Sequence, residues 1–557
     1  MMKKIILIGI ALTCTSVFTM VDIISKLDVQ NMSLNEKIGQ LFCVSMPIQA
    51  NQQRIDAMSN LIKEYHIGSV ILHRHGSPER VLKLGNALRQ VDSNLLIFLD
   101  AEWGLNMRLP NAMRFPRNMT LGAIKDNRLI YQVGREIGRQ LKCIGINVNC
   151  APVVDINNNP NNPVINDRSF GEDPQQVIIK SLLFMQGLQE AGILASAKHF
   201  SGHGDTATDS HLGLPILLHD KERLENVELR PFQVHADNGI TAIMTSHMAV
   251  PTLTGDSQCP ITFSRNAIDY LRNKIEFDGL VITDGLNMQA LHKYFSNNGL
   301  PHEPGDIELN ALLAGHDILV MAENIPAAID KIKKAISNGS LTESELDAHV
   351  TRILRAKASS NGPTQLTNSL QRELFNGNAR TLKKKLYSQA VTLVANTLIP
   401  VADKPSMAYL QVGGTRESAF QHQLENLLPN IESEYINAIP TGPDMTEVQT
   451  FLEPDETIIV GIFEMNKFAG RDFGIAPDTF LFLETLKAKG KKLIVCLFGS
   501  PYALKFFDDY DTVVMAYEDD IDAQIAGANI IAGKQKAMGK LPVTASDKYR
   551  AKEGIES

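Results

Sequence analysis

Eight short apolar runs follow one another between residues 33 and 360, and amphipathic segments separate them. The runs are 39–46, 67–73, 95–100, 144–150, 193–199, 241–247, 279–284 and 317–322. The segments between them, such as 78–91 and 174–192, repeat apolar residues every three or four positions, as helices that pack on a sheet do. This alternation predicts an α/β fold in which residues 33–360 form a (β/α)8 TIM-like barrel.

A second α/β domain is predicted at residues 387–550, after a polar connector with some helical character at 361–386. Its apolar runs are 391–396, 406–413, 457–463, 492–499 and 512–517. Continuous apolar runs are typical of parallel strands that are buried on both faces, so we expect an open sheet with helices on both sides. Two domains also suit a chain of 557 residues.

Residues 1–20 have the order of a secretory signal peptide. Two lysines precede an apolar run at 5–12, which is shorter than the roughly 20 residues that span a bilayer. We therefore expect a periplasmic or extracellular protein with no stable membrane span after cleavage. A short N-terminal membrane anchor and lipidation at Cys14 are the alternatives.

Composition excludes several classes of protein. The net charge is -8 and no window clusters lysine and arginine with aromatic residues, so nucleic acid is not an expected partner. Of the six cysteines, Cys14 lies in the leader and the other five are scattered, which does not describe a disulfide framework. The sequence contains no CxxC or HExxH motif, and we expect no metal and no cofactor. The oligomeric state is open.

Polar residues stand at the ends of the predicted barrel strands. They are Asp100, Lys198, His199, His247 and Asp284. Barrel enzymes place their chemistry at the carboxyl ends of the strands and in the loops that follow. A strand-end or loop role explains any one of these residues, but their number favours an active site.

The segment 198–215, KHFSGHGDTATDSHLGLP, follows the fifth run. Its glycines, Gly202 and Gly204, predict a mobile loop that folds over a substrate. The segment resembles the KH(F/I)PGHG...DSH signature of family 3 glycoside hydrolases, in their β-N-acetylglucosaminidase branch. Residues 147–174, 281–288 and 314–321 resemble other segments of that family. The predicted second domain is similar to the family's α/β sandwich domain by architecture.

The resemblance implies a retaining, exo-acting hydrolase that removes terminal non-reducing β-linked N-acetylglucosamine from peptidoglycan fragments or chito-oligosaccharides. Asp284 takes the position of the nucleophile that forms the covalent glycosyl-enzyme. Asp209 and His211 match the pair that supplies acid and base, in which the carboxylate fixes the imidazole tautomer and stabilises its protonated form. The two side chains meet only if the backbone turns between them.

Further positions match residues that hold the sugar: Asp100, Arg108, Arg168, Lys198 and His199. Charged hydrogen bonds suit a polyhydroxylated ligand. For Arg168 the alternative is a structural ion pair with one of three acids, which are Asp155, Asp167 and Glu172. The Lys198–His199 pair also has a purely structural alternative.

The chain departs from the family pattern at three places. Ser201 replaces a common proline, and Gly285 replaces a common aspartate or alanine. Residues 100–109, DAEWGLNMRL, replace an EGGR-type sequence, so the role of Arg108 depends on a different spacing. Trp103 is the only tryptophan, and either stacks on a sugar or packs inside the protein.

Four other functions stay open at this point. They are phosphorolysis of N-acetylglucosaminides, β-glucosidase activity, a catalytically silent carbohydrate-binding scaffold on the same fold, and a metal hydrolase. The last would use His199, His203, Asp205 and His211, which are residue types that ligate zinc.

Overall fold

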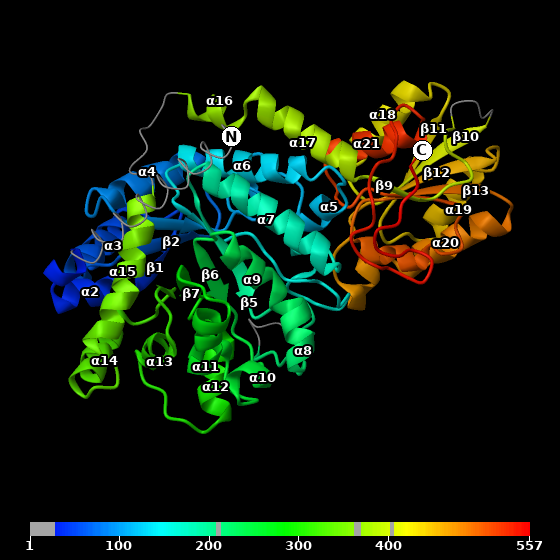
Figure 1. Cartoon of the computed structure of the whole chain (residues 1–557). Helices are drawn as coiled ribbons and strands as arrows, with labels where there is room; N and C mark the ends of the chain where they lie inside the picture. Colours follow the sequence, from blue (N-terminus) through cyan, green and yellow to red (C-terminus); the bar gives the residue numbers. More distant parts are fainter. Residues whose placement is uncertain (1–27, 208–212, 361–368, 402–405, 557) are drawn as a thin grey trace, which may run out of the picture.

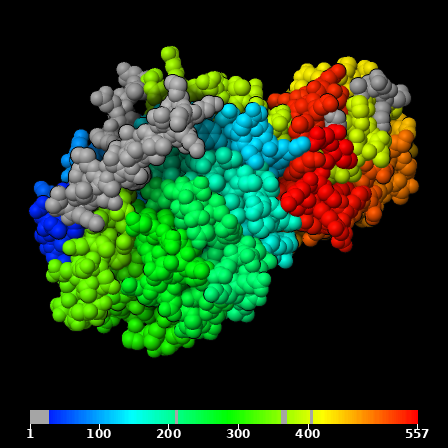
Figure 2. Space-filling model, viewed as in Figure 1, coloured from blue at the N-terminus to red at the C-terminus, as the bar shows by residue number. Residues whose placement is uncertain are grey.

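Two α/β units lie side by side in the protein (Figures 1 and 2). The structure is a computed structural model, and it describes residues 28–207, 213–360, 369–401 and 406–556. The predicted signal peptide at 1–20 lies outside the described residues. Among the helices that the structure describes, none has the length and apolar character needed to cross a bilayer.

The first unit is the predicted barrel, and the structure confirms it. Neighbouring strands pair in parallel in the order β7-β6-β5-β4-β3-β2-β1-β8. A parallel bridge between Ile282 and Ile318 brings β7 beside β8 and closes the circle. The strands are β1 (Phe42–Pro47), β2 (Ser69–His73), β3 (Leu96–Leu99), β4 (Val148–Asn149), β5 (Leu194–Phe200), β6 (Ala242–Thr245), β7 (Leu280–Thr283) and β8 (Leu319–Val320).

Helices form the outer layer of the barrel (Figure 1). The main ones are α3 (Gln52–Tyr65), α4 (Pro78–Arg89), α6 (Arg128–Cys143), α7 (Pro174–Glu190), α9 (Arg230–Asp237), α11 (Arg265–Asp269), α13 (Asp306–Ala314), α14 (Ile325–Ser337) and α15 (Glu343–Ser359). Their starts follow from local sequence. Asp173 accepts a hydrogen bond from the Gln176 N–H at the start of α7, and Pro174 takes the first helical position, where its missing N–H costs nothing.

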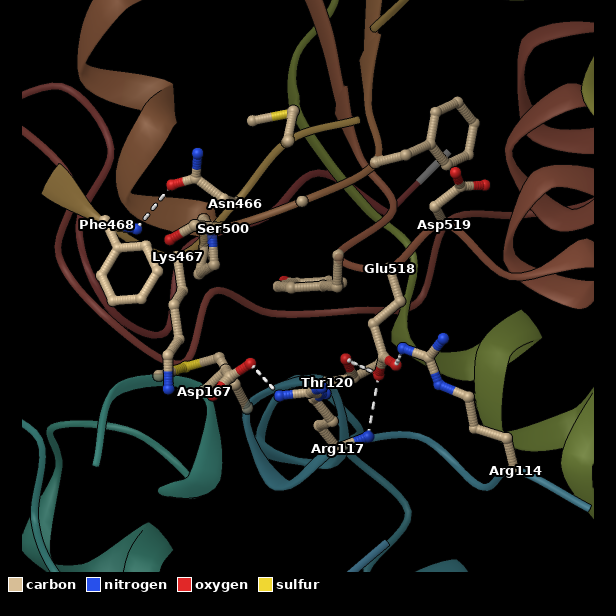
Figure 3. Close-up of a pocket in the computed structure, with 16 residues that line it drawn as sticks. Arg114, Arg117, Thr120, Asp167, Asn466, Lys467, Phe468, Ser500, Glu518 and Asp519 are labelled. Atoms are coloured by element: carbon tan, nitrogen blue, oxygen red, sulfur yellow. Dashed lines mark hydrogen bonds and ion pairs between the residues drawn. The ribbon is translucent and has the colours of Figure 1, made fainter. Parts of the chain in front are cut away.

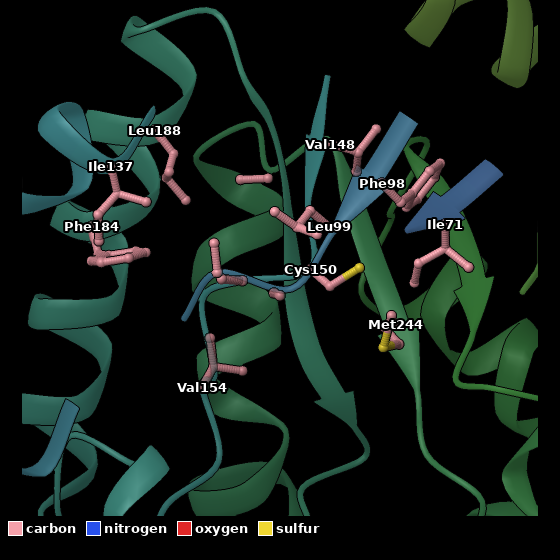
Figure 4. Close-up of a cluster of buried hydrophobic side chains, with 14 of the residues drawn as sticks. Ile71, Phe98, Leu99, Ile137, Val148, Cys150, Val154, Phe184, Leu188 and Met244 are labelled. Atoms are coloured by element: carbon pink, nitrogen blue, oxygen red, sulfur yellow. The ribbon is translucent and has the colours of Figure 1, made fainter. Parts of the chain in front are cut away.

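Side chains alternate between the two faces of each barrel strand. One face packs under the helices, and the other points into the barrel, where the site lies. Ile137 of α6 lies with Phe184 and Leu188 of α7 in the layer between helices and strands, whereas Phe98 lies on the other side of the view, within the barrel (Figure 4). Successive strand residues point to opposite faces, so Asp100, two positions after Phe98, also points inward and reaches the open end of the barrel.

The second unit is a six-stranded sheet in the order β11-β10-β12-β13-β14-β9. The strands are β9 (Thr392–Ala395), β10 (Met407–Val412), β11 (Glu432–Ile436), β12 (Thr457–Ile462), β13 (Lys492–Leu497) and β14 (Thr512–Met515). Helices α18 (Ala419–Leu427) and α21 (Ile521–Ile531) pack on one face, and α19 (Gly442–Phe451) and α20 (Pro477–Ala488) lie across the other (Figure 1). The runs that we predicted as strands are confirmed. The sequence analysis missed β11, and β9 pairs antiparallel with β14.

The connector between the sheets contains two helices, α16 (Leu370–Leu374) and α17 (Gly377–Ala390). Direct contacts also join the two units, and Glu518 of the second unit makes several of them. Its carboxylate pairs with Arg114, accepts the Arg117 N–H at 2.8 Å and accepts the Thr120 hydroxyl at 2.7 Å (Figure 3). Away from that residue, the Asn157 side chain donates to the Tyr502 hydroxyl at 2.8 Å. The second sheet is therefore tied to the loops at the open end of the barrel.

Candidate active site

A cavity of about 650 Å³ opens at the carboxyl ends of the barrel strands. The ends of β2, β5, β6 and β8 line it, together with the loops after β3, β4, β5, β7 and β8 and one residue of the second unit. The polar lining residues include His73, Asp100, Glu102, Arg108, Arg168, Lys198, His199, His203, Asp284, Asn287, Gln289 and Lys467. The structure thus brings together every predicted sugar-binding residue and the predicted nucleophile.

Two carboxylates and three cations form one network on a wall of the cavity. Lys198 Nζ lies 3.1 Å from Asp100 Oδ1 and 2.8 Å from Glu102 Oε1. Arg108 binds Asp100 at 2.5 Å. Burial would raise the pKa of the Asp100 carboxyl, but the charges of Lys198 and Arg108 outweigh it and lower that pKa to about 2. Asp100 is therefore ionised at neutral pH and can act only as a hydrogen-bond acceptor in the cavity.

Glu102 is a member of this network that the sequence analysis missed. It binds Arg168 through both oxygens, at 2.8 and 2.9 Å, in the bidentate geometry that guanidinium and carboxylate favour. Our alternative for Arg168 named three other acids, and the structure pairs this arginine with Glu102 instead. The sequence gives one indication of this role, because Glu102 stands two residues after Asp100, but it does not distinguish Glu102 from the other acids nearby.

Asp155 holds the start of the histidine loop and was also missed as a site residue. It is buried, and its carboxylate accepts the backbone N–H of His203 at 2.7 Å and that of His199 at 3.2 Å. It also lies 2.7 Å from Nδ1 of the His199 ring. Burial would raise the pKa of Asp155, but the neighbouring histidines lower it, so the carboxylate accepts and Nδ1 donates. Arg168 donates to the other ring nitrogen at 3.3 Å, which fixes the His199 tautomer.

Asp284 follows directly after β7 and reaches into the cavity. Its carboxylate accepts the Gly285 N–H at 2.7 Å and forms no ion pair with a residue that the structure describes. Burial would raise its pKa, but the His199 and His247 rings and the Gly285 N–H lower it. His247 contacts the Gly285 carbonyl at 2.9 Å, so it supports the segment that carries Asp284. The result is an ionised carboxylate that faces the cavity.

Asp209 and His211 fall in 208–212, outside the described residues, so their predicted contact stays a prediction. The described stems of this loop are held firmly. Asn162 donates to the carbonyls of His203 and Gly204 at 2.8 and 3.1 Å. Further along, Asp205 lies 2.9 Å from the His219 ring.

The residues that the structure describes contain no group of side chains arranged to bind a metal ion, as the metal-hydrolase hypothesis requires. No three histidine, cysteine, aspartate or glutamate side chains there are grouped as metal ligands would be. His203, one of the four residues in that hypothesis, is occupied at its Nδ1 by the Thr206 hydroxyl at 2.6 Å. Burial lowers the pKa of the His203 ring to about 4.

Trp103 lines the cavity, and Arg117 covers its ring with the guanidinium carbon 4.4 Å from the ring centroid. The same arginine pairs with Asp167 at 2.5 Å. Asp167 in turn lies 3.7 Å from the Lys467 ammonium of the second unit. The second domain therefore contributes a cation to the lining of the barrel's cavity.

The family model described as the glycosyl hydrolase family 3 N-terminal domain matches residues 33–356. The chain belongs to glycosyl hydrolase family 3. It is therefore a glycoside hydrolase, and Asp284, which we predicted as its nucleophile, lies in the cavity described above. A relative that aligns over both domains is β-hexosaminidase A of Pseudoalteromonas piscicida, which is 30% identical over 87% of this chain and 90% of its own length.

Two solved structures superpose on both units of the chain. A β-N-acetylglucosaminidase from Paenibacillus sp. str. FPU-7 superposes with a TM-score of 0.74 at 30% identity, over 92% of this chain and 99% of that one. The β-glucoside phosphorylase BglX superposes with a TM-score of 0.78 at 20% identity, over 94% of this chain and 96% of that one. The second likeness shows the fold alone.

Proposed function

We propose that this family 3 enzyme is an exported β-N-acetylhexosaminidase that removes terminal non-reducing β-linked N-acetylglucosamine with retention of configuration. Peptidoglycan fragments or chito-oligosaccharides are the proposed substrates. Asp284 attacks the anomeric carbon and forms the glycosyl-enzyme, and His211, oriented by Asp209, protonates the leaving oxygen and then deprotonates water. The names of the relatives at 30% identity support the choice of sugar.

The observation that carries the proposal is the state of Asp284. Its carboxylate is ionised, lies in the sugar-sized cavity and is not neutralised by an ion pair with a described residue. Arg108, Arg168 and Lys198 instead form ion pairs with Asp100 and Glu102. A nucleophile must keep its lone pairs available to the substrate, whereas sugar-binding carboxylates are held in fixed networks.

The test is a panel of p-nitrophenyl glycosides. We expect the N-acetylglucosaminide to be cleaved with a kcat/KM well above those of the glucoside and the xyloside, with the β-anomer released first in NMR spectra. Asp284→Asn should lower kcat by about 1,000-fold or more. A fluorinated N-acetylglucosaminyl inactivator should label the peptide that contains Asp284.

Three results would contradict this assignment. Preference for the glucoside would make the enzyme a β-glucosidase, and sugar 1-phosphate formed on addition of inorganic phosphate would make it a phosphorylase. Undiminished binding by Asp284→Ala, with no product from the wild type, would indicate a scaffold. Cell fractionation tests export separately. A cytoplasmic location would contradict the proposed export and leave the proposed activity unaffected.

A further inference from the structure

A second cavity of about 370 Å³ adjoins the catalytic one, between the two domains. Residues 160–163 of the barrel form one side, and residues 467–471 of the second domain form the other. Pro163 and Lys467 line both cavities, so the two spaces are neighbours. We call the second one the outer cavity. The outer cavity lies on the side of the catalytic cavity that faces the second domain.

The wall from the second domain is held in place against the barrel. Asn166 of the barrel donates to the Lys467 carbonyl at 3.1 Å, and Asp167 lies 3.7 Å from the Lys467 ammonium. Within the segment, the Phe468 N–H donates to the Asn466 side chain at 2.9 Å. The outer cavity is therefore preorganised, which reduces the ordering that a ligand must impose on it.

The lining of the outer cavity has a distinct chemistry. Phe468 keeps 40% of its surface exposed, although the ring lies beside the cavity. The Lys467 ammonium and the Arg471 guanidinium lie 5.9 and 5.5 Å from its ring centroid. Among the residues that line this cavity, Lys467 and Arg471 are the charged ones, and none is acidic. An apolar ring beside two cations suits a ligand with one apolar face and a negative charge.

We propose that the outer cavity binds the sugar on the leaving-group side of the scissile bond, and that Lys467 and Arg471 select a sugar that carries a carboxylate. Phe468 packs against the C–H face of that sugar. The proposal rests on the function proposed above and gives the second domain a role in substrate choice. A neutral chito-oligosaccharide would use the ring but not the two cations.

The experiment compares three substrates that share the same terminal N-acetylglucosamine. They are the p-nitrophenyl glycoside, the β-linked disaccharide with N-acetylmuramic acid, and the methyl ester of that disaccharide. The aryl glycoside has no leaving-group sugar, and the ester removes only the charge. For the wild type at low salt we expect kcat/KM to favour the acid over the ester by about fivefold, and the preference to shrink as salt is added.

The variants separate the two parts of the outer cavity. The double variant Lys467→Ala/Arg471→Ala should bring the ratio of acid to ester close to one. Phe468→Ala should lower kcat/KM for both disaccharides about tenfold relative to the aryl glycoside, and Phe468→Trp should restore it. Lys487→Ala is the matched control, because Lys487 also lies beside an aromatic ring, Tyr510, but on the outer helix α20. It should keep both ratios at their wild-type values.

Equal rates for acid and ester in the wild type would overturn the carboxylate selectivity, and so would a preference that survives in the double variant. If Phe468→Ala slowed the aryl glycoside as much as the disaccharides, the ring would not belong to a leaving-group site. Failure of the wild type to cleave the aryl N-acetylglucosaminide would instead overturn the proposed function, and this proposal with it.

Discussion

At the scale of single residues, the site depends on carboxylates that do not react. Asp155 accepts the backbone N–H groups of His199 and His203 and fixes the His199 ring, so one buried side chain sets both the path of the loop and an imidazole tautomer. Supporting partners of this kind orient the residues that touch the substrate, and they often matter nearly as much. Asp155 is a positioning residue, because its own oxygens are occupied by the protein.

Asp155→Asn tests this role, since it keeps the shape of the side chain and removes its charge. We expect kcat for the aryl N-acetylglucosaminide to fall about 10- to 100-fold, with a smaller change in KM, because the acceptor of the His199 ring loses its negative charge. The matched control Asp278→Asn removes an acid that is 75% exposed and should leave kcat within about twofold. An unchanged kcat in a folded Asp155→Asn protein would refute the positioning role.

At the scale of elements, two glycines shape the segment after β5 in different ways. Gly202 provides an unusual backbone conformation, and Gly204 allows a close contact between two backbone segments. Gly202 does adopt a positive φ of 102°. A Cβ on Gly204, however, would lie 1.7 Å from the Ile156 carbonyl oxygen, so this glycine lets two backbone segments touch. We predicted a mobile loop from both glycines. The structure shows that Gly204 holds the stem of that loop against the segment after β4, and the mobility of the loop itself stays a prediction.

Gly204→Ala should therefore displace the stem. We expect the free energy of unfolding to fall by about 1–3 kcal/mol in urea titrations, together with a loss of activity. Gly377→Ala is the control, because its Cβ would meet nothing within 4 Å and its φ is not positive. Equal stability of the two variants would show that the Ile156 contact relaxes without cost.

The elements also show how far sequence reasoning reaches. Apolar runs predicted the barrel and five of the strands in the second sheet, because buried parallel strands leave a continuous signal. They missed β11, ESEYI, an edge strand whose residues are mostly half-exposed and which has no continuous apolar run. The periodicity could not show that Asp155 and Glu102 serve the site, because several other acids stand nearby and only the folded chain decides which of them face the histidine loop and Arg168.

At the scale of the whole molecule, the two domains share charged groups across their interface. Glu518→Ala should leave Arg114 without its partner and the Arg117 N–H and Thr120 hydroxyl without their acceptor. Because breaking one side of a buried ion pair is costly, we expect the free energy of unfolding to fall by about 3 kcal/mol. Calorimetry or urea titration measures this change.

Glu484→Ala provides the comparison for that experiment. Glu484 is an acid of the second domain that is 56% exposed and pairs with Lys487, so its removal should cost less than about 1 kcal/mol. If Glu518→Ala and Glu484→Ala unfolded at the same urea concentration, the interface would draw no measurable stability from Glu518.

The position of Glu518 bears on how such enzymes can be recombined. The polypeptide changes domain at the connector, which invites a crossover there. However, the carboxylate that binds the barrel loop of residues 114–120 belongs to Glu518, which lies in the second domain, after the connector. In a hybrid of this barrel and a second domain from another protein, the loop therefore lacks its hydrogen-bond acceptor unless that second domain has an acidic residue at the position of Glu518. Parents for such hybrids are better chosen by this one residue than by overall identity.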